Sequence, residues 1–338
     1  MSVKERIVAE IEARGPMPFE RFMDLALYHQ GGFFASDQLR SQKAGDFLTS
    51  PEVSPLFGET LAVYVEQERD RIGEPFQLIE VGAGSGSLLG PLLDVFPVDV
   101  IAIEASPAAR KALSRVVPIC ERLPDRLRGV VIANELVDNF PMALAQRIDG
   151  SWRERWVALD GDGLAFVDAE PRLEVLSWLD SYGGDVADSG WVEVQLAARE
   201  WLTELVTRLE AGSVLVIDYG DIAENLLSRR KDGTLRTYRA HHLGPHPLDE
   251  PGETDITADV NFSALLDVVP GSRLIRQDDF LTGLGLRDRL REIRHQELEA
   301  ARHGDDEARL GFRSLKTEAE TLLHPRGLGD FRVLIVEV

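Results

Sequence analysis

Apolar residues recur at the spacing of an α-helix through most of the first 72 residues. One helix is predicted to end at Gly15, where Gly-Pro interrupts the pattern, and a second lies within residues 18–29. A third is predicted over residues 55–71, with a proline at its first position. The polar stretch 42–54 reads as a loop. This part of the chain is therefore predicted to be a helical N-terminal extension.

The middle of the chain alternates between short apolar runs and helical patterns. The apolar runs at 76–81, 98–105 and 129–136 are typical of buried strands, and the segments at 87–96 and 106–116 have helical spacing. Strands that alternate with helices predict an α/β fold, in which a parallel sheet has helices on both faces. Ligands of such sheets bind at the carboxyl ends of the strands.

Residues 146–170 break this order, because apolar and polar residues alternate there. Asp149-Gly150 and Asp162-Gly163 predict hairpin turns, so we expect an antiparallel β insertion beside the main sheet. Residues 213–220 form a further buried strand after a helix, and residues 331–338 form the closing one.

Residues 232–257 lack both patterns and are predicted to be a long loop. Loops of this length are usually functional. We therefore expect this segment to have a functional role.

The negative net charge of the chain indicates which kinds of partner it can bind. The 338 residues carry 58 acidic and 37 basic side chains, a formal net charge of −21. Nucleic-acid binding needs a basic footprint, so we expect no nucleic-acid partner. An acidic cleft would attract a cationic partner, although solubility alone also explains the charge.

Signals for export, membrane insertion and metal binding are not found in the sequence. Cys120 is the only cysteine, which excludes an internal disulfide and a Cys-rich metal site. The first 15 residues lack the apolar centre of a signal peptide, and no apolar run reaches the roughly 20 residues of a membrane span. The seven histidines show no zinc-ligand spacing. We expect a cytoplasmic protein with no metal and no membrane partner; a homodimer remains open.

A glycine-rich turn follows the first strand. Gly82, Gly84 and Gly86 alternate there, and Ser87 stands where a dinucleotide-binding motif would have its third glycine. Glycines let a ligand pass close to the backbone. Glu80 precedes the turn, and its carboxylate can hold an ammonium group. The pattern favours S-adenosyl-L-methionine, which carries an ammonium and no phosphate, over a dinucleotide.

Polar residues also end the next two strands. Glu104 lies where a carboxylate can accept hydrogen bonds from both ribose hydroxyls of the cofactor, as it also does in NAD proteins. Asn134 and Glu135 end the third strand, beside the expected sulfonium. Asn134 could instead cap the next helix, whereas capping explains Glu135 less well. A tight turn that binds no ligand is the alternative for the whole motif.

The loop before the third helix carries Asp46, Thr49 and Ser50 without an apolar pattern. One explanation is helix capping by Ser50 or Ser54. The other is that residues 45–51 fold over the cofactor as a lid, with Asp46, Thr49 and Ser50 among the cofactor-binding residues.

With these motifs the sequence resembles the MidA-like class I methyltransferases. The resemblance covers nearly the whole chain, and its segments keep their order and approximate spacing. Two of them, "SPEVSPLFGE" and "ANELVDNFP", are specific to this family among methyltransferases. The segments are GPMPFERFMDLALYH, GDFLTSPEVSPLFGETLA, EVGAGSGSL, ANELVDNFP, VLVIDYG, GTLRTYRAHH, PGETDITADVNF and LLHPRGLGDFRVL.

The resemblance implies a seven-stranded, Rossmann-like class I methyltransferase sheet whose closing strand is antiparallel. We expect residues 1–72 to form the helical extension with the lid loop. Residues 73–338 would form the methyltransferase core, with insertions near 145–190 and 220–260. The family includes a mitochondrial assembly factor for respiratory complex I that resembles a protein arginine methyltransferase.

Two places depart from the family pattern. Gln30 replaces a proline, and Phe33-Phe34 replace tyrosines. Glu193 matches a glutamate that the family retains, but the Ser-Pro after it is lost and Gln195 stands in its place. If these positions shape the substrate pocket, the methyl acceptor differs from that of the relatives.

The expected activity is S-adenosyl-L-methionine-dependent methyl transfer to a protein arginine. Carboxylates would hold the guanidinium, and Glu135 and Glu193 are the candidates, with Asn134 beside them. Glu193 could instead cap the helix that follows it. A small-molecule acceptor is one alternative, and an assembly factor that binds the cofactor with little turnover is another.

Overall fold

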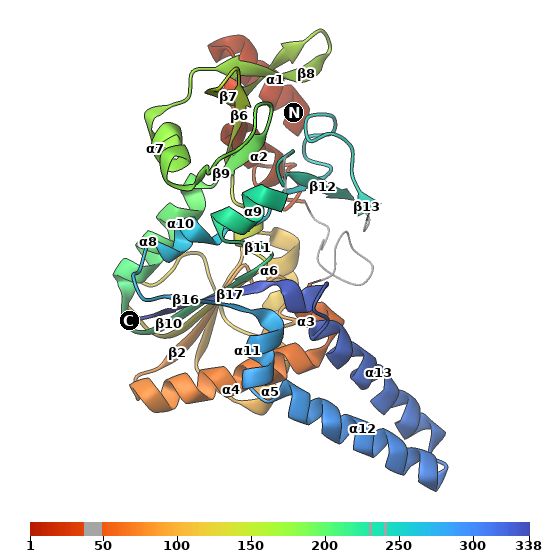
Figure 1. The fold of residues 1–338 in the computed structure, drawn as a ribbon. Helices are drawn as coiled ribbons and strands as arrows, with labels where there is room; N and C mark the ends of the chain where they lie inside the picture. Colours follow the sequence, from red (N-terminus) through yellow and green to blue (C-terminus); the bar gives the residue numbers. More distant parts are fainter. Residues whose placement is uncertain (37–48, 230–231, 240–241) are drawn as a thin grey trace.

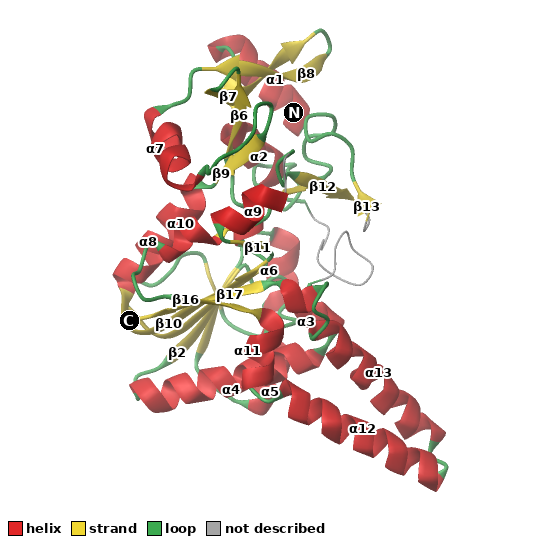
Figure 2. Cartoon of the chain, viewed as in Figure 1, coloured by secondary structure: helices red, strands yellow, loops and turns green. Residues whose placement is uncertain are grey.

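Two sheets lie one above the other in the molecule, with a helical hairpin extending from the lower one (Figures 1 and 2). The computed structural model describes residues 1–36, 49–229, 232–239 and 242–338. No helix within these residues is long and apolar enough to cross a bilayer.

The larger sheet has seven strands in the order β16-β17-β10-β5-β2-β3-β4. Five of them run parallel, and β17 is antiparallel to both of its neighbours. This confirms the predicted class I methyltransferase sheet with its antiparallel closing strand. The strands are β2 (Gln77–Val81), β3 (Val100–Ile103), β4 (Ile119–Cys120), β5 (Leu127–Asn134), β10 (Leu209–Asp218), β16 (Arg273–Arg276) and β17 (Arg332–Glu337).

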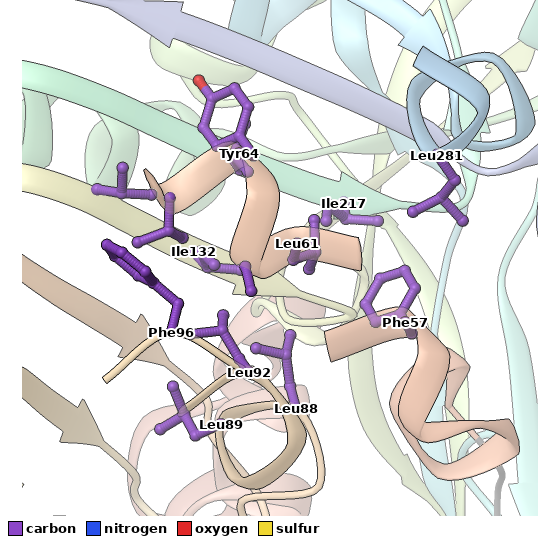
Figure 3. Packing of buried hydrophobic residues seen from close by; sticks show 14 of the residues in the cluster. Phe57, Leu61, Tyr64, Leu88, Leu89, Leu92, Phe96, Ile132, Ile217 and Leu281 are labelled. Atoms are coloured by element: carbon purple, nitrogen blue, oxygen red, sulfur yellow. The ribbon is translucent and has the colours of Figure 1, made fainter. Parts of the chain in front are cut away.

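Helices bury both faces of this sheet because most residues of its central strands are apolar and buried. Successive residues of a strand point to opposite faces, so Leu78 enters the core on one side and Ile79 the core on the other. Figure 3 shows Phe57 and Leu61 in the same buried core as Ile132 and Ile217 of the sheet. Fully burying a side chain of this size stabilises the fold by about 1.5–3 kcal/mol. These helices are α4 (Pro55–Ile72), α5 (Leu89–Val95), α6 (Pro107–Leu113), α8 (Leu196–Arg208), α10 (Phe262–Leu266) and α11 (Gln277–Gly283).

The smaller sheet is antiparallel and contains the predicted insertion. Its order is β1-β7-β6-β9, with β8 paired to β7. Phe19 and Phe22 of the N-terminal helices pack on it in a core of their own with Leu144 and Val157. The elements are α1 (Val3–Arg14), β1 (Met17–Pro18), α2 (Phe19–Leu27), β6 (Ala143–Ile148), β7 (Ser151–Asp160), β8 (Gly163–Ala169), α7 (Leu173–Tyr182) and β9 (Trp191–Val194).

One detail of the smaller sheet differs from the sequence prediction. Asp160 pairs with Gly163, so the second hairpin turn is Gly161-Asp162 and not Asp162-Gly163. Gly161 supplies the positive φ of 56° that the turn needs. Helix α4 belongs to the core of the larger sheet, whereas α1 and α2 pack in the core of the smaller one.

Residues 232–257 were predicted to be one long loop, and that prediction is wrong for the three short strands within the segment. Arg236–Arg239 (β12) pairs with both His242–Leu243 (β13) and Asp255–Thr257 (β14) in a small antiparallel sheet. The pairing satisfies backbone groups that a loop would leave to solvent.

A helical hairpin, α12 (Leu286–His303) with α13 (Asp306–Leu322), projects away from the sheet in Figure 2. No motif in the sequence predicted it. The remaining elements are α3 (Ser50–Val53), η1 (Val137–Asn139), β11 (Gly220–Asp221), α9 (Ala223–Arg229), β15 (Val260–Asn261) and η2 (Leu328–Asp330).

Candidate active site

Two cavities adjoin at the carboxyl ends of the central strands. The smaller cavity, of about 210 Å³, is lined by the glycine turn and by the ends of β3 and β5. The larger cavity, of about 910 Å³, extends towards the C-terminal segment. Glu135 and Asn139 line both cavities and therefore stand where the two meet.

The glycine turn gives the smaller cavity a wall of bare backbone. Gly84 has φ +54°, and a Cβ added there would meet no atom within 4 Å, so the space beside it is open. Gly82 also lines the cavity, but a Cβ on it would lie 2.8 Å from Leu136 Cδ1. Gly86 is not among the lining residues, and its neighbour is Leu113 of the core. The first two glycines thus face the cavity, and the third shapes the turn.

Glu104, just after β3, is hydrogen-bonded to the glycine turn. Its carboxylate accepts hydrogen bonds from the backbone N–H of Gly84 at 2.8 Å and of Ser106 at 2.7 Å. Burial raises the pKa of Glu104, and these hydrogen bonds oppose the rise. A carboxylate has about four acceptor sites, so Glu104 can still accept from ligand hydroxyls in the smaller cavity.

Glu80 and Asn134 each have a buried side-chain oxygen without a hydrogen-bond partner in the described part of the chain. Both residues line the smaller cavity, and Glu80 Oε2 and Asn134 Oδ1 have no hydrogen-bond partner among the described residues. Burial, together with the nearby charge of Glu104, raises the pKa of Glu80 well above its usual range. Buried acceptors without donors are costly. A ligand that brings an ammonium group would donate hydrogen bonds to both oxygens, so these acceptors fit S-adenosyl-L-methionine.

Glu135 has a strained backbone at the end of β5. Its φ is +49°, which is uncommon for a residue with a side chain and occurs at functional sites. Its Oε1 accepts hydrogen bonds from Ser50 N at 3.0 Å and from Asn134 Nδ2 at 3.4 Å. Burial raises the pKa of Glu135 to about 8. Glu135 can therefore exchange a proton near neutral pH.

The predicted lid is described only in part. Thr49 and Pro51 line the smaller cavity. Ser50 contacts Glu135 through its backbone, and its Oγ accepts a hydrogen bond from Gln277 Nε2 at 3.3 Å. Asp46 lies outside the described residues. Ser54, not Ser50, caps α4, because its Oγ accepts from Leu56 N at 3.3 Å.

Glu193 is placed away from this group. Its carboxylate accepts hydrogen bonds from Thr234 N at 2.7 Å, Leu235 N at 2.9 Å and Thr234 Oγ1 at 3.1 Å. It lines neither cavity. The structure therefore does not bring Glu193 together with Glu135, and its contacts hold the segment that leads into β12.

The positions that depart from the family pattern have different surroundings. Phe34 lines the smaller cavity, whereas Phe33 is buried in the core of the N-terminal helices. Gln30 is exposed. Gln195 is buried and joins two backbones, because it donates to Asp259 O at 3.2 Å and accepts from Asn261 N at 2.8 Å.

Sequence reasoning missed several residues of the smaller cavity, among them Tyr28 and Asn139. Tyr28 stacks on Phe34, with ring centroids 5.6 Å apart, and donates a hydrogen bond to Asn139 O at 3.0 Å. Both Tyr28 and Asn139 line the cavity. Each stands in a segment that carries the family resemblance, and this was the only available signal. They connect α2 to the end of β5.

The larger cavity draws on five of the segments that carried the resemblance, including ANELVDNFP and LLHPRGLGDFRVL. Its lining is rich in acids, with seven carboxylates against three guanidinium groups. Arg236 forms an ion pair with Asp259, and Arg332 forms one with Asp221 at 2.7 Å. The acidic residues are Glu135, Asp138, Asp221, Asp255, Asp259, Glu320 and Asp330. Their excess favours a cationic occupant.

The described part of the chain contains no cluster of side chains suited to metal binding. No group of three or more His, Cys, Asp or Glu side chains is arranged there to hold a metal ion.

Known proteins resemble this chain over most of its length. A family model described as "Putative S-adenosyl-L-methionine-dependent methyltransferase" matches residues 60–275. The chain is 30% identical over 338 residues to the Homo sapiens protein arginine methyltransferase NDUFAF7, mitochondrial, covering 85% of this chain and 74% of the relative. It is 29% identical to the Drosophila melanogaster homologue over 308 residues, 77% of this chain and 68% of the relative.

A solved structure shares the fold almost end to end. This is a crystal structure of a protein from Burkholderia thailandensis bound to S-adenosyl-homocysteine. It has a TM-score of 0.86 and 28% sequence identity, and the match covers 99% of this chain and 92% of that one.

The comparisons correct the predicted location. We predicted a cytoplasmic protein, but these relatives are named as mitochondrial proteins, and that finding overturns the prediction. The prediction rested on missing export signals, and the absence of a signal does not determine a compartment.

The glycine turn, the buried acceptors around it, the seven-stranded sheet and the family match agree with one another. The chain belongs to the family of S-adenosyl-L-methionine-dependent methyltransferases that this model describes, and S-adenosyl-L-methionine is its cofactor.

Proposed function

We propose that this protein methylates the guanidinium group of an arginine side chain in another protein. The observation that carries the proposal is the position of Glu135, whose side chain lines both the smaller and the larger cavity. A carboxylate at that point can touch the acceptor next to the cofactor. Relatives named as protein arginine methyltransferases support the same acceptor.

The residues of the smaller cavity are proposed to hold the cofactor. Glu80 and Asn134 would accept hydrogen bonds from its ammonium group, and Glu104 from its ribose hydroxyls. Gly82 and Gly84 would let it lie against the backbone. Thr49 would contact it from α3. When bound, the cofactor supplies a methyl group on a sulfonium, which is electrophilic.

The chemistry of arginine explains why carboxylates are needed. A guanidinium stays protonated, with a pKa above about 12, and its lone pairs are delocalised. Carboxylates match its planar fork and draw the positive charge towards the nitrogens that they touch. We propose that Glu135 holds the guanidinium at the junction and accepts the proton that the methylated nitrogen loses. Its pKa of about 8 is suited to that exchange.

The larger cavity is proposed to receive the arginine and the chain around it. Its excess of carboxylates would attract a cationic segment and disfavour an acidic one. The net charge of −21 acts in the same direction over a longer range. A protein substrate that presents an exposed, arginine-bearing segment fits these features.

We also propose the division of the chain that the sequence suggested, with one change. Residues 1–54 would form the extension, and α4 would join the core because it packs on the larger sheet. The insertions near 145–190 and 220–260 would remain.

Labelling a lysate tests the acceptor. Purified protein is incubated with methyl-tritiated S-adenosyl-L-methionine and a lysate of the cells that encode it, and the labelled proteins are then hydrolysed in acid. We expect the label to elute with methylated arginine. The Gly84→Val variant serves as the control for background labelling. Label found only in small metabolites, or on another amino acid, would reject the arginine acceptor.

A further inference from the structure

Asp138 lies one short turn beyond Glu135, in η1, and lines the larger cavity. Its side chain is buried. Oδ2 accepts hydrogen bonds from Tyr219 Oη and from Thr257 Oγ1, the latter at 2.6 Å. Oδ1 is also buried, but it has no hydrogen-bond partner among the described residues.

Asp138 Oδ1 is thus left available to accept a hydrogen bond from a donor outside the described part of the chain. Two hydroxyls hold Oδ2 in place, so the orientation of the carboxylate is fixed. Arg236, the cation near Tyr219, forms its ion pair with Asp259. A buried carboxylate oxygen without a donor is costly, which points to a ligand that brings an N–H group.

The two carboxylates belong to one small region. Asp138 and Glu135 line the same cavity, and the charge of Asp138 contributes to the raised pKa of Glu135, after burial. Two carboxylates that repel each other are relieved by a shared cation. A guanidinium suits the place because it offers five N–H donors in a planar fork, enough for both groups.

We infer that Asp138 is a second acceptor-binding residue, whose Oδ1 accepts a hydrogen bond from the guanidinium that Glu135 holds. Tyr219 and Thr257 act through it as positioning residues. The inference rests on the proposed function and names a residue that neither the motifs nor the comparisons assign.

Calorimetric titration of the full chain, with S-adenosylhomocysteine present, tests the inference. The probe is N-acetyl-L-arginine amide, and its comparator is N-acetyl-L-citrulline amide, which has nearly the same shape but no charge. The variants are Asp138→Asn, which keeps the shape of the side chain, and Tyr219→Phe. Glu297→Gln is the matched control, because it also removes one carboxylate charge, but Glu297 lines neither cavity and is paired with Lys316 at 2.8 Å.

Wild-type protein is expected to bind the arginine probe and to discriminate against citrulline. Asp138→Asn should weaken arginine binding about tenfold or more, and Tyr219→Phe should weaken it by several-fold. Glu297→Gln should bind as wild type does. Affinity for S-adenosylhomocysteine should stay within about twofold in every variant, because Asp138, Tyr219 and Glu297 do not line the smaller cavity; this checks the fold.

Two results overturn the inference in different ways. If Asp138→Asn binds the arginine probe as wild type does, the role of Asp138 is wrong and the proposed function stands. If wild-type protein binds citrulline as well as arginine, the guanidinium acceptor itself is wrong, and the inference falls with it.

Discussion

Gly84 is the residue at which cofactor binding can be separated from folding. A valine there would place its side chain in the open space of the smaller cavity, since no atom lies within 4 Å of an added Cβ. We expect Gly84→Val to abolish S-adenosyl-L-methionine binding in calorimetry while the protein stays folded.

Gly161→Val controls for backbone strain in this experiment. Gly161 has nearly the same φ, +56° against +54°, and also has nothing within 4 Å, but it lies in the turn between β7 and β8. Its variant should bind the cofactor normally. Unchanged affinity in Gly84→Val would contradict the assignment of the cavity.

Glu104 should strengthen cofactor binding in two ways. Its carboxylate accepts hydrogen bonds from the ribose, and it also fixes the glycine turn by accepting one from Gly84 N. A charge-assisted hydrogen bond contributes about 1.5–3 kcal/mol. Glu104→Ala is therefore expected to weaken cofactor binding by roughly one to two orders of magnitude. Glu121→Ala, which removes an exposed carboxylate paired with Arg110, is the control. A change below about threefold in Glu104→Ala would leave Glu104 without the proposed role.

The pH dependence of cofactor binding should report on Glu135. Because burial raises its pKa to about 8, Glu135 is mostly protonated at neutral pH. A cationic ligand beside it favours the ionised form, so binding should release a proton, and affinity should rise as the pH approaches about 8. Glu80 contributes in the same direction, since burial raises its pKa too.

Titrations in buffers with different ionisation enthalpies count the released protons. Glu135→Gln should release fewer protons than wild type and show a flatter rise of affinity with pH. Equal proton release from the two proteins would contradict this prediction, because it would show that Glu135 does not change its protonation state when the cofactor binds.

At the scale of elements, α3 is the part of the chain that should respond most to the cofactor. Thr49 and Pro51 line the smaller cavity, and Ser50 N donates to Glu135. We expect the amides of Ser50, Glu52 and Val53 to gain protection from hydrogen exchange when S-adenosyl-L-methionine binds. The amides of α1 (Val3–Arg14), which packs in another core, are the internal control. Protection that is unchanged at α3 would exclude a closing role.

Elements with a strong local pattern could be predicted from the sequence. The alternation of strands and helices from residue 76 to 136 gave the parallel sheet, because apolar runs such as that of β2 are buried on both faces. The small sheet of β12, β13 and β14 could not be predicted. Its strands are short, and the pairing of Arg236 with Thr257 joins residues far apart in sequence.

The site shows the same limit for individual side chains. Residues at strand ends, such as Glu80 and Glu104, were predictable because the carboxyl ends of parallel strands meet. Glu193 also lies near the end of a strand, but that strand belongs to the antiparallel sheet. The carboxylate of Glu193 accepts a hydrogen bond from Thr234. Tyr28 reaches the cavity from α2 through tertiary packing, which no local pattern reveals.

At the scale of the whole molecule, segments that are far apart in the sequence lie around the carboxylate of Glu135. The smaller cavity takes residues from Tyr28 to Asn139, and the larger one takes residues from Glu135 to Arg332. The cavity that reaches the N-terminal helices and the cavity that reaches the C-terminal strand are therefore both lined by Glu135. If the proposed function is right, a change at this residue should separate cofactor binding from methyl transfer.

Comparing Glu135→Gln with wild type on the arginine-bearing protein found by labelling is the most direct test. Cofactor affinity and the rate of methyl transfer in a single turnover are measured for both. We predict that the affinity changes less than about threefold, while the rate falls by roughly one to two orders of magnitude, because a charge-assisted bond to the acceptor is lost. Near-normal methyl transfer by Glu135→Gln would contradict the account.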